Sequence, residues 1–337
     1  MNDLKTTLTE KPIADITAQY PQTAELLANY NLAYLAQDKT IPDALTAIPK
    51  EELEEFGLTA DELIERLFDF LTALYAKKEA SADVIRTITI IGGQSKSGEQ
   101  EDITLTISAG EIVSIVGPTG SGKSRLLADI ECLAQGDTPT KRTILVNDKP
   151  LTLQERFRMG THLVAQLSQN MNFILDISVA EFLEMHAKSR LIESSASVID
   201  ACFDAANDLA GEPFTRETKV TQLSGGQSRA LMIADTAYIS ESPIVLIDEI
   251  ENAGVDRERA LSVLTKNDKI VLISTHDPLL ALRANRRIVI KNGGMSDIIE
   301  TSDEEKSSLA HIEALRRTLS AVQHDLRTGR RIDRIPE

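Results

Sequence analysis

A glycine-rich stretch at residues 117–124 constrains the fold of this chain more than any other feature. Its sequence, GPTGSGKS, matches G-x-x-x-x-G-K-S/T at every fixed position. The apolar run IVSIV before it suits a buried strand, and RLLADI after it suits a helix. A strand, a glycine loop and a helix in this order are typical of a phosphate-binding loop, and they predict an α/β fold.

The residue types of this loop suit the binding of phosphate. Glycines let the backbone curl so that successive N–H groups point at phosphate oxygens, and the helix N-terminus adds positive partial charge. Lys123 can reach the β- and γ-phosphates, and the Ser124 hydroxyl can coordinate Mg²⁺. We therefore expect phosphate to be bound by Gly117, Pro118, Thr119, Gly120, Ser121, Gly122, Lys123 and Ser124.

The composition limits the compartment and the partners. The 337 residues carry a formal net charge of −16, which argues against a protein that binds nucleic acid phosphates non-specifically. The two cysteines, Cys132 and Cys202, make neither a disulfide framework nor a metal quartet, which favours a reducing compartment. We find neither a signal peptide nor an apolar run long enough to span a membrane. We expect a cytoplasmic protein that lies at the inner face of a membrane only if another chain supplies the membrane part.

Residues 1–80 are predicted to form a helical domain, in which TADE at 59–62 is a capping box. The order of PI at 12–13, YPQTAE at 20–25 and YNL at 30–32 resembles a small helical domain of unknown function. That domain is common beside redox and iron–sulfur proteins of anaerobes and usually carries Cys-x-x-Cys. Here Tyr34 and Gln37 occupy those positions, so the resemblance implies an interaction module rather than a metal site.

The rest of the chain predicts one larger domain, residues 84–300, followed by a C-terminal helix in residues 301–337. Two β-rich runs, at 84–91 and 103–107, indicate an antiparallel β-layer beside the parallel sheet. Residues 175–222 have helical periodicity, and the lone His186 there is interpreted as a surface or core residue rather than a ligand. In the last helix an apolar seam permits docking on its own chain, which we favour, or self-pairing. The seam consists of Ile312, Leu315, Leu319, Val322 and Leu326.

Three further motifs carry polar groups at the ends of predicted elements. LSGGQ at 223–227 puts two glycines before a helical run, which makes an anion site. Asp248 and Glu249 end an apolar strand, where they suit Mg²⁺ binding and general-base chemistry, although an acidic turn is the alternative. His276 follows another buried strand, at the sheet edge where ligands bind in parallel α/β folds.

With these motifs in this order, residues 84–300 resemble an ATP-binding cassette (ABC) ATPase. The resemblance implies an α/β fold of the P-loop NTPase type, with a parallel sheet, an antiparallel β-layer and a helical subdomain. It also implies ATP and Mg²⁺ as cofactors, with Mg²⁺ held by Ser124, Gln169 and Asp248. Gln166 competes with Gln169 as the metal-binding glutamine, but the spacing to the next helix favours Gln169. The catalytic residues implied are Glu249, His276, Lys123 and Gln169.

The resemblance further implies that two cassettes meet head to tail, most simply as a homodimer. ATP bound by the phosphate loop of one copy would be closed over by Ser224, Gly225, Gly226 and Gln227 of the other. Two departures from the family stand out. The segment at 250–256 is one residue longer than usual, and the loop at 92–98 lacks the aromatic residue that stacks on adenine.

Two biological roles fit these observations. One is a cassette ATPase that remodels a soluble protein client, such as a metalloenzyme or a cofactor-assembly complex. The other is the energy subunit of a membrane transporter that works on a permease. The N-terminal domain, the longer segment and the C-terminal helix favour the first role over the second.

Overall fold

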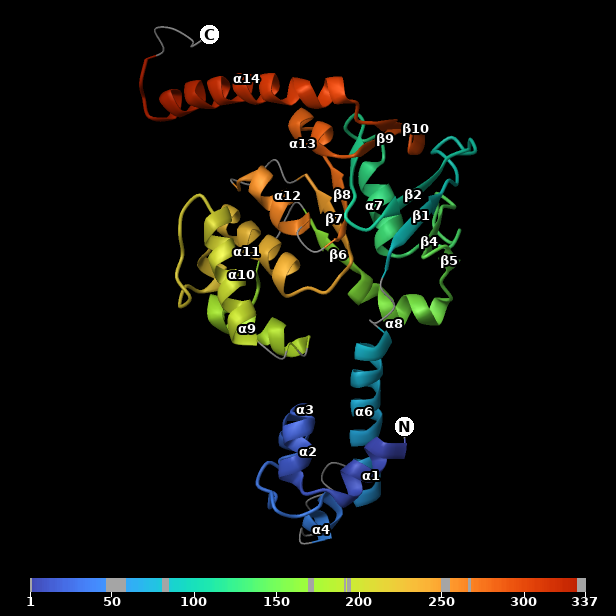
Figure 1. Ribbon diagram of the computed structural model, residues 1–337, viewed down its shortest axis with the longest axis vertical. Helices are drawn as coiled ribbons and strands as arrows, with labels where there is room; N and C mark the ends of the chain where they lie inside the picture. The colour runs from blue at the N-terminus through green and yellow to red at the C-terminus, as the bar shows by residue number, and fades with distance from the viewer. Residues whose placement is uncertain are drawn as a thin grey trace. The chain divides into compact units, whose positions relative to one another are not determined.

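The computed structural model describes residues 2–46, 59–80, 85–168, 173–190, 192, 195–249, 255–265 and 268–331. The chain divides into two compact units, Met1–Val84 and Ile85–Glu337 (Figure 1). Each unit has hydrophobic clusters of its own. None of the described helices is long and apolar enough to cross a membrane.

The first unit is helical. Its core contains fully buried side chains such as Leu8, Ile16 and Leu67. The predicted capping box is present, because Thr59 N donates to Glu62 Oε2 (2.8 Å) and Glu62 N donates to Thr59 Oγ1 (3.3 Å). The side chain of Tyr34 is exposed. The helices are α1 (Asn2–Glu10), α2 (Ile13–Gln19), α3 (Gln22–Asn29), α4 (Ile41–Thr46) and α6 (Ala60–Ala80).

A six-stranded sheet forms the centre of the second unit, in the order β10-β9-β3-β8-β7-β6. Every pairing is parallel except that of β10 with β9, which closes one edge. Strands β7 and β8 are apolar almost throughout because helices cover both faces of a parallel sheet. The strands are β3 (Ile112–Val116), β6 (Val164–Leu167), β7 (Ile244–Asp248), β8 (Ile270–Ser274), β9 (Arg286–Lys291) and β10 (Gly294–Glu300).

The predicted antiparallel β-layer is present as a separate four-stranded sheet, in the order β2-β1-β4-β5. Helix α7 (Lys123–Glu131) shares one core with both sheets: Leu126, Leu127 and Ile130 pack in the same cluster as β1 and β3 side chains. The phosphate loop therefore starts from the middle of the sheet and ends at a buried helix. The strands of this layer are β1 (Thr87–Ile91), β2 (Thr104–Ser108), β4 (Thr143–Val146) and β5 (Lys149–Pro150).

Helices α9, α10 and α11 pack together in a third cluster on one side of this unit (Figure 1). His186 of α9 contacts Asp235 of α11 (Nδ1 to Oδ1, 2.9 Å) and so joins two helices. The helices of this unit not yet given are α8 (Leu153–Leu163), α9 (Val179–Ser189), α10 (Ser195–Leu209), η1 (Val220–Gln222), α11 (Gly225–Tyr238), α12 (Arg257–Thr265), α13 (Pro278–Arg283) and α14 (Asp303–Arg327).

The C-terminal helix α14 docks on its own chain, but its leucines do not make the contact. It lies along α13 (Figure 1), and ion pairs join the two helices. The expected docking of the helix is present, and Ile312 and Val322 of the seam are half-buried, but Leu315, Leu319 and Leu326 are 58–61% exposed and take no part in it. The ion pairs to α13 come from Glu313 and Arg316, which lie close to Ile312 on the helix.

Candidate active site

The phosphate loop can be built only with glycine at two of its positions. Gly117 and Gly122 have φ angles of 154° and 111°. A Cβ atom on Gly117 would lie 2.5 Å from Ile290 O, and one on Gly122 would lie 2.9 Å from the Cα of Gly293. Gly293 N also donates to Ser121 O (2.6 Å). The loop is thus fitted closely against the turn between β9 and β10.

Three side chains from three adjacent strands meet beside this loop. Lys123 follows β3, Glu249 follows β7 and His276 follows β8, and these strands are neighbours in the sheet. Lys123 Nζ lies 3.0 Å from His276 Nε2, which in turn lies 3.7 Å from Glu249 Oε1. Parallel strands bring their carboxyl ends to one edge, so residues 153 positions apart come into contact.

Lys123 is a nearly buried cation in this group. Its ammonium donates to Gly117 O (3.0 Å) and lies 3.4 Å from Pro118 O. Among the residues that the structure describes, no carboxylate forms an ion pair with it, although its side chain is 6% exposed. A buried charge normally requires a partner of opposite sign. The residues of the loop therefore fit an anionic ligand such as the phosphates of ATP.

Ser124 and Asp248 supply oxygen atoms for a divalent cation. Ser124 Oγ donates to Asp248 Oδ2 (3.1 Å) across the gap between α7 and β7. Mg²⁺ prefers oxygen ligands and is bound by one or two protein groups together with substrate phosphates. In the described part of the chain, no group of three or more His, Cys, Asp or Glu is placed so that it could hold a metal ion by itself. The pair thus fits Mg²⁺ held jointly with a nucleotide.

Glu249 is held in an unusual backbone conformation. Its φ is 50°, and its backbone N–H donates to Ser274 O (3.0 Å) on the neighbouring strand. Residues other than glycine adopt this region at a cost, and such outliers cluster at functional sites. The strand edge thus holds the carboxylate toward His276.

The LSGGQ segment lies at the start of α11. Ser224 is the N-cap: Gln227 N donates to Ser224 Oγ (3.3 Å), and Ser224 N donates to Gln227 Oε1 (2.8 Å). Ser224 and Gly225 are exposed, and a Cβ on Gly225 would meet nothing within 4 Å. Within the described residues no hydrogen bond joins this segment to the phosphate loop. In the part of one copy that the structure describes, the LSGGQ segment and the phosphate loop are thus not joined to each other by hydrogen bonds.

Of the two candidate glutamines, Gln166 lies within the described part of the chain. Gln169 lies outside the described residues, as do residues 250–254 of the longer segment. Gln166 is in β6, and with its amide oriented to donate, its nitrogen lies 2.8 and 3.0 Å from the carboxylate oxygens of Glu131. Glu131 is the last residue of α7, whereas Lys123 is the first. Gln166 therefore binds at the C-terminal end of α7, whereas the phosphate loop lies at its N-terminal end.

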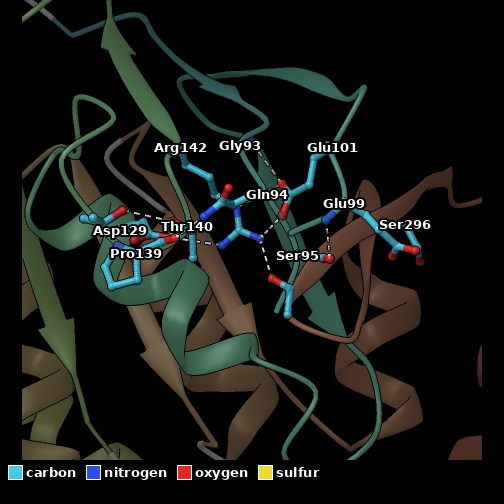
Figure 2. Close-up of polar contacts among 12 residues, drawn as sticks. Gly93, Gln94, Ser95, Glu99, Glu101, Asp129, Pro139, Thr140, Arg142 and Ser296 are labelled. Atoms are coloured by element: carbon cyan, nitrogen blue, oxygen red, sulfur yellow. Dashed lines mark hydrogen bonds and ion pairs between the residues drawn. The ribbon is translucent and has the colours of Figure 1, made fainter. Parts of the chain in front are cut away.

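The loop without an aromatic residue is anchored by a charged cluster that no sequence motif reveals. Figure 2 shows the Arg142 guanidinium between Glu101 on one side and Asp129 with Thr140 on the other. Arg142 is fully buried. Its Nη2 lies 2.6 Å from Glu101 Oε1 and 2.7 Å from Gly293 O, and its Nη1 lies 2.9 Å from Asp129 Oδ2. Lys96 from the same loop donates to Gly120 O (2.8 Å). The cluster joins this loop, α7 and the β9–β10 turn around the phosphate loop.

Comparison with known proteins identifies the family. The ABC transporter family model matches residues 100–252. Over 249 residues the chain is 52% identical to an uncharacterized ABC transporter ATP-binding protein of Methanocaldococcus jannaschii, a match that covers 74% of this chain and 95% of that protein. The chain belongs to the ABC transporter ATP-binding proteins. The expected α/β fold of a P-loop ABC ATPase is confirmed, and the chain is an ATPase that uses ATP.

More distant relatives extend the comparison. The macrolide export ATP-binding/permease protein MacB of Campylobacter jejuni is 29% identical over 237 residues, a match that covers 66% of this chain and 35% of that protein. The cassette thus spans about a third of MacB. A dimeric ATP-binding cassette solved with ADP and phosphate has a TM-score of 0.50 at 25% identity, covering 64% of this chain and 99% of that one. The family model does not include residues 1–80, so the resemblance of that segment stays a prediction.

Proposed function

We propose that this cassette is the energy subunit of an ABC membrane transporter, binding and hydrolysing ATP in a dimer that drives a permease. The match to an ABC transporter ATP-binding protein over 95% of its length carries this proposal. MacB, whose name joins the ATP-binding and permease functions, supports it. The soluble client that the sequence analysis favoured has no such support. Residues 1–80 would serve as an interaction module.

The proposed chemistry assigns a task to each residue near the phosphate loop. Lys123 and the backbone N–H groups of the loop bind the phosphates, while Ser124, Asp248 and Gln169 provide oxygen ligands for Mg²⁺. When bound, Mg²⁺ neutralises charge on the β- and γ-phosphates. Glu249 orients the attacking water and accepts its proton at a carboxylate oxygen. His276 Nε2 hydrogen-bonds the γ-phosphate.

The proposed dimer completes each site with residues from the other copy. The exposed start of α11 offers Ser224, Gly225, Gly226 and Gln227 to the phosphates bound by the facing phosphate loop. Backbone N–H groups at a helix N-terminus attract anions. The solved relative with ADP and phosphate is likewise a dimer.

Dimerisation provides a direct test. With ATP and Mg²⁺ the Glu249→Gln variant should double in mass by light scattering, because the nucleotide joins the two copies and is not consumed. Adding Ser224→Arg should keep it monomeric, since a bulky cation then occupies the place of the facing γ-phosphate. Ser307→Arg, on the exposed side of α14, is the matched control and should still dimerise. One unchanged mass under all these conditions would contradict closure by this chain alone.

The surface offers apolar side chains to a membrane partner. Leu153 and Phe157, four residues apart on α8, are 62% and 80% exposed. Exposed apolar groups of this size mark interaction sites when they cluster. The net charge of −16 also suits the cytoplasmic loops of membrane proteins, which carry an excess of Lys and Arg.

Recovery of the partner tests the transporter role. The Glu249→Gln cassette, cross-linked in its own cells with ATP bound, should purify with a polytopic membrane protein. Phe157→Asp should reduce that recovery at least about fivefold, because it places a charge where an apolar side chain contributes about 1.5–3 kcal/mol when fully buried. Gln154→Asp on the same helix adds the same charge at an exposed polar position and should have little effect. Recovery of soluble proteins only would instead favour the client role.

A further inference from the structure

One carboxylate joins three helices beside the active site. Asp277 forms ion pairs with Arg257, the first residue of α12, and with Arg316 of α14 (3.2 Å). Its side chain is only 8% exposed. It also caps α13, because Leu279 N donates to Asp277 Oδ1 (2.8 Å). The orientation of Asp277 therefore depends on α12 and α14 as well as on its own helix.

A second group of ion pairs joins the same three helices. Here an arginine lies between two carboxylates, whereas Asp277 lies between two arginines. Arg283, the last residue of α13, lies 2.6 Å from Glu258 of α12 and 2.6 Å from Glu313 of α14. Both bridges cross the same three helices, with the charges reversed between them. This pairing fixes the register of α14 on α13 and explains why its leucines are not needed for docking.

The first bridge contains the residue that follows His276 in the chain. Asp277 directly follows His276, and its backbone N–H donates to Thr275 Oγ1 (2.9 Å). Arg257 opens the helix that follows the segment after Glu249. His276 Nε2 lies 3.0 Å from Lys123 Nζ, so a small shift of the His276 backbone changes the distances to the reacting phosphate. A misplacement of about 1 Å in an active site can cost about 100-fold in rate.

We propose that Asp277 is a positioning residue for His276 and that Arg316 sets its orientation, so that docking of α14 controls the rate of ATP hydrolysis. The inference rests on the proposed role of His276. Arg316 is 38% exposed, and an ion pair of this kind adds little to stability. Its loss should therefore alter the position of His276 without unfolding the domain.

The test compares neighbouring arginines in the full chain. Arg316→Ala should lower kcat about tenfold, with KM for ATP within about twofold and little change in Tm. Arg316→Lys should recover most of the rate, because it retains the cation beside Asp277. Arg317→Ala is the matched control: Arg317 is 80% exposed and meets Glu313 only at 3.8 Å, so its rate should stay parental. Arg316→Met keeps the aliphatic stem and replaces Arg316→Ala if that variant folds poorly.

The His276→Ala variant distinguishes the proposed role of His276 from the proposed control of the rate by α14. If His276→Ala hydrolyses ATP at the parental rate, the proposed role of His276 is wrong. If His276→Ala is inactive while Arg316→Ala and Arg316→Met keep the parental kcat, only the control by α14 is overturned. A fall in kcat that merely follows a loss of folded protein or of ATP binding would also overturn it, because Arg316 would then have a structural role alone.

Discussion

Replacement of Glu249 by glutamine is expected to lower ATP turnover at least about 100-fold while ATP binding stays within about twofold of the parental value. The amide has the shape of the carboxylate but cannot accept a proton from the attacking water, and a general base contributes about 10²–10⁴-fold to rate. Steady-state phosphate release and a binding titration with ATP and Mg²⁺ measure the two quantities. Lys123→Ala should instead weaken binding itself, since it removes the cation nearest the phosphates.

A control for this variant lies at the other end of the same strand, just outside it. Glu241→Gln makes the same chemical change just before β7, at the end opposite Glu249, in an exposed position. Its turnover should equal that of the parent. A Glu249→Gln protein that hydrolyses ATP at the parental rate would remove Glu249 from the proposed chemistry.

Replacement of Arg142 by alanine should destabilise the second unit by about 3–5 kcal/mol, because it leaves two buried carboxylates without their cation. Glu101 and Asp129 have side-chain exposures of only 2% and 1%. In a unit of this size such a loss corresponds to a Tm lower by roughly 6–20 °C. Thermal unfolding followed by circular dichroism measures the change.

An exposed arginine provides the comparison. Arg216 pairs with Asp200 (2.7 Å) at side-chain exposures of 36% and 62%, and Arg216→Ala should cost no more than about 1 kcal/mol. Replacing Arg142, Glu101 and Asp129 together by apolar residues of similar size should recover much of the loss. Equal effects of Arg142→Ala and Arg216→Ala would show that the buried cluster does not support this unit.

The parts of the site that could be predicted from sequence are those set by short segments. The phosphate loop, the carboxylates after β7 and the histidine after β8 each follow an apolar strand, and parallel strands bring such ends to one edge. The sequence also indicated the antiparallel layer. It did not indicate the strand order that places β3 between β8 and β9.

The features that sequence reasoning missed depend on contacts between distant residues. Arg142 and Glu101 are 41 positions apart, and Arg142 and Gly293 are 151 apart. A charged residue is usually exposed, so nothing local marks Arg142 as buried. The seam of α14 is a related case, because periodicity identifies an apolar face but not which of its residues the neighbouring helix contacts.

The strand order also has a consequence for synthesis on the ribosome. The strand before the phosphate loop has both its neighbours, β8 and β9, in the last third of the chain, and the turn at Gly293 that supports the loop emerges later still. At about 5–20 residues per second, roughly 10–30 s pass between synthesis of the loop and synthesis of β9. A nascent chain therefore carries an unfinished nucleotide site for about half of its translation. Truncated products ending before β9 should not retain ATP.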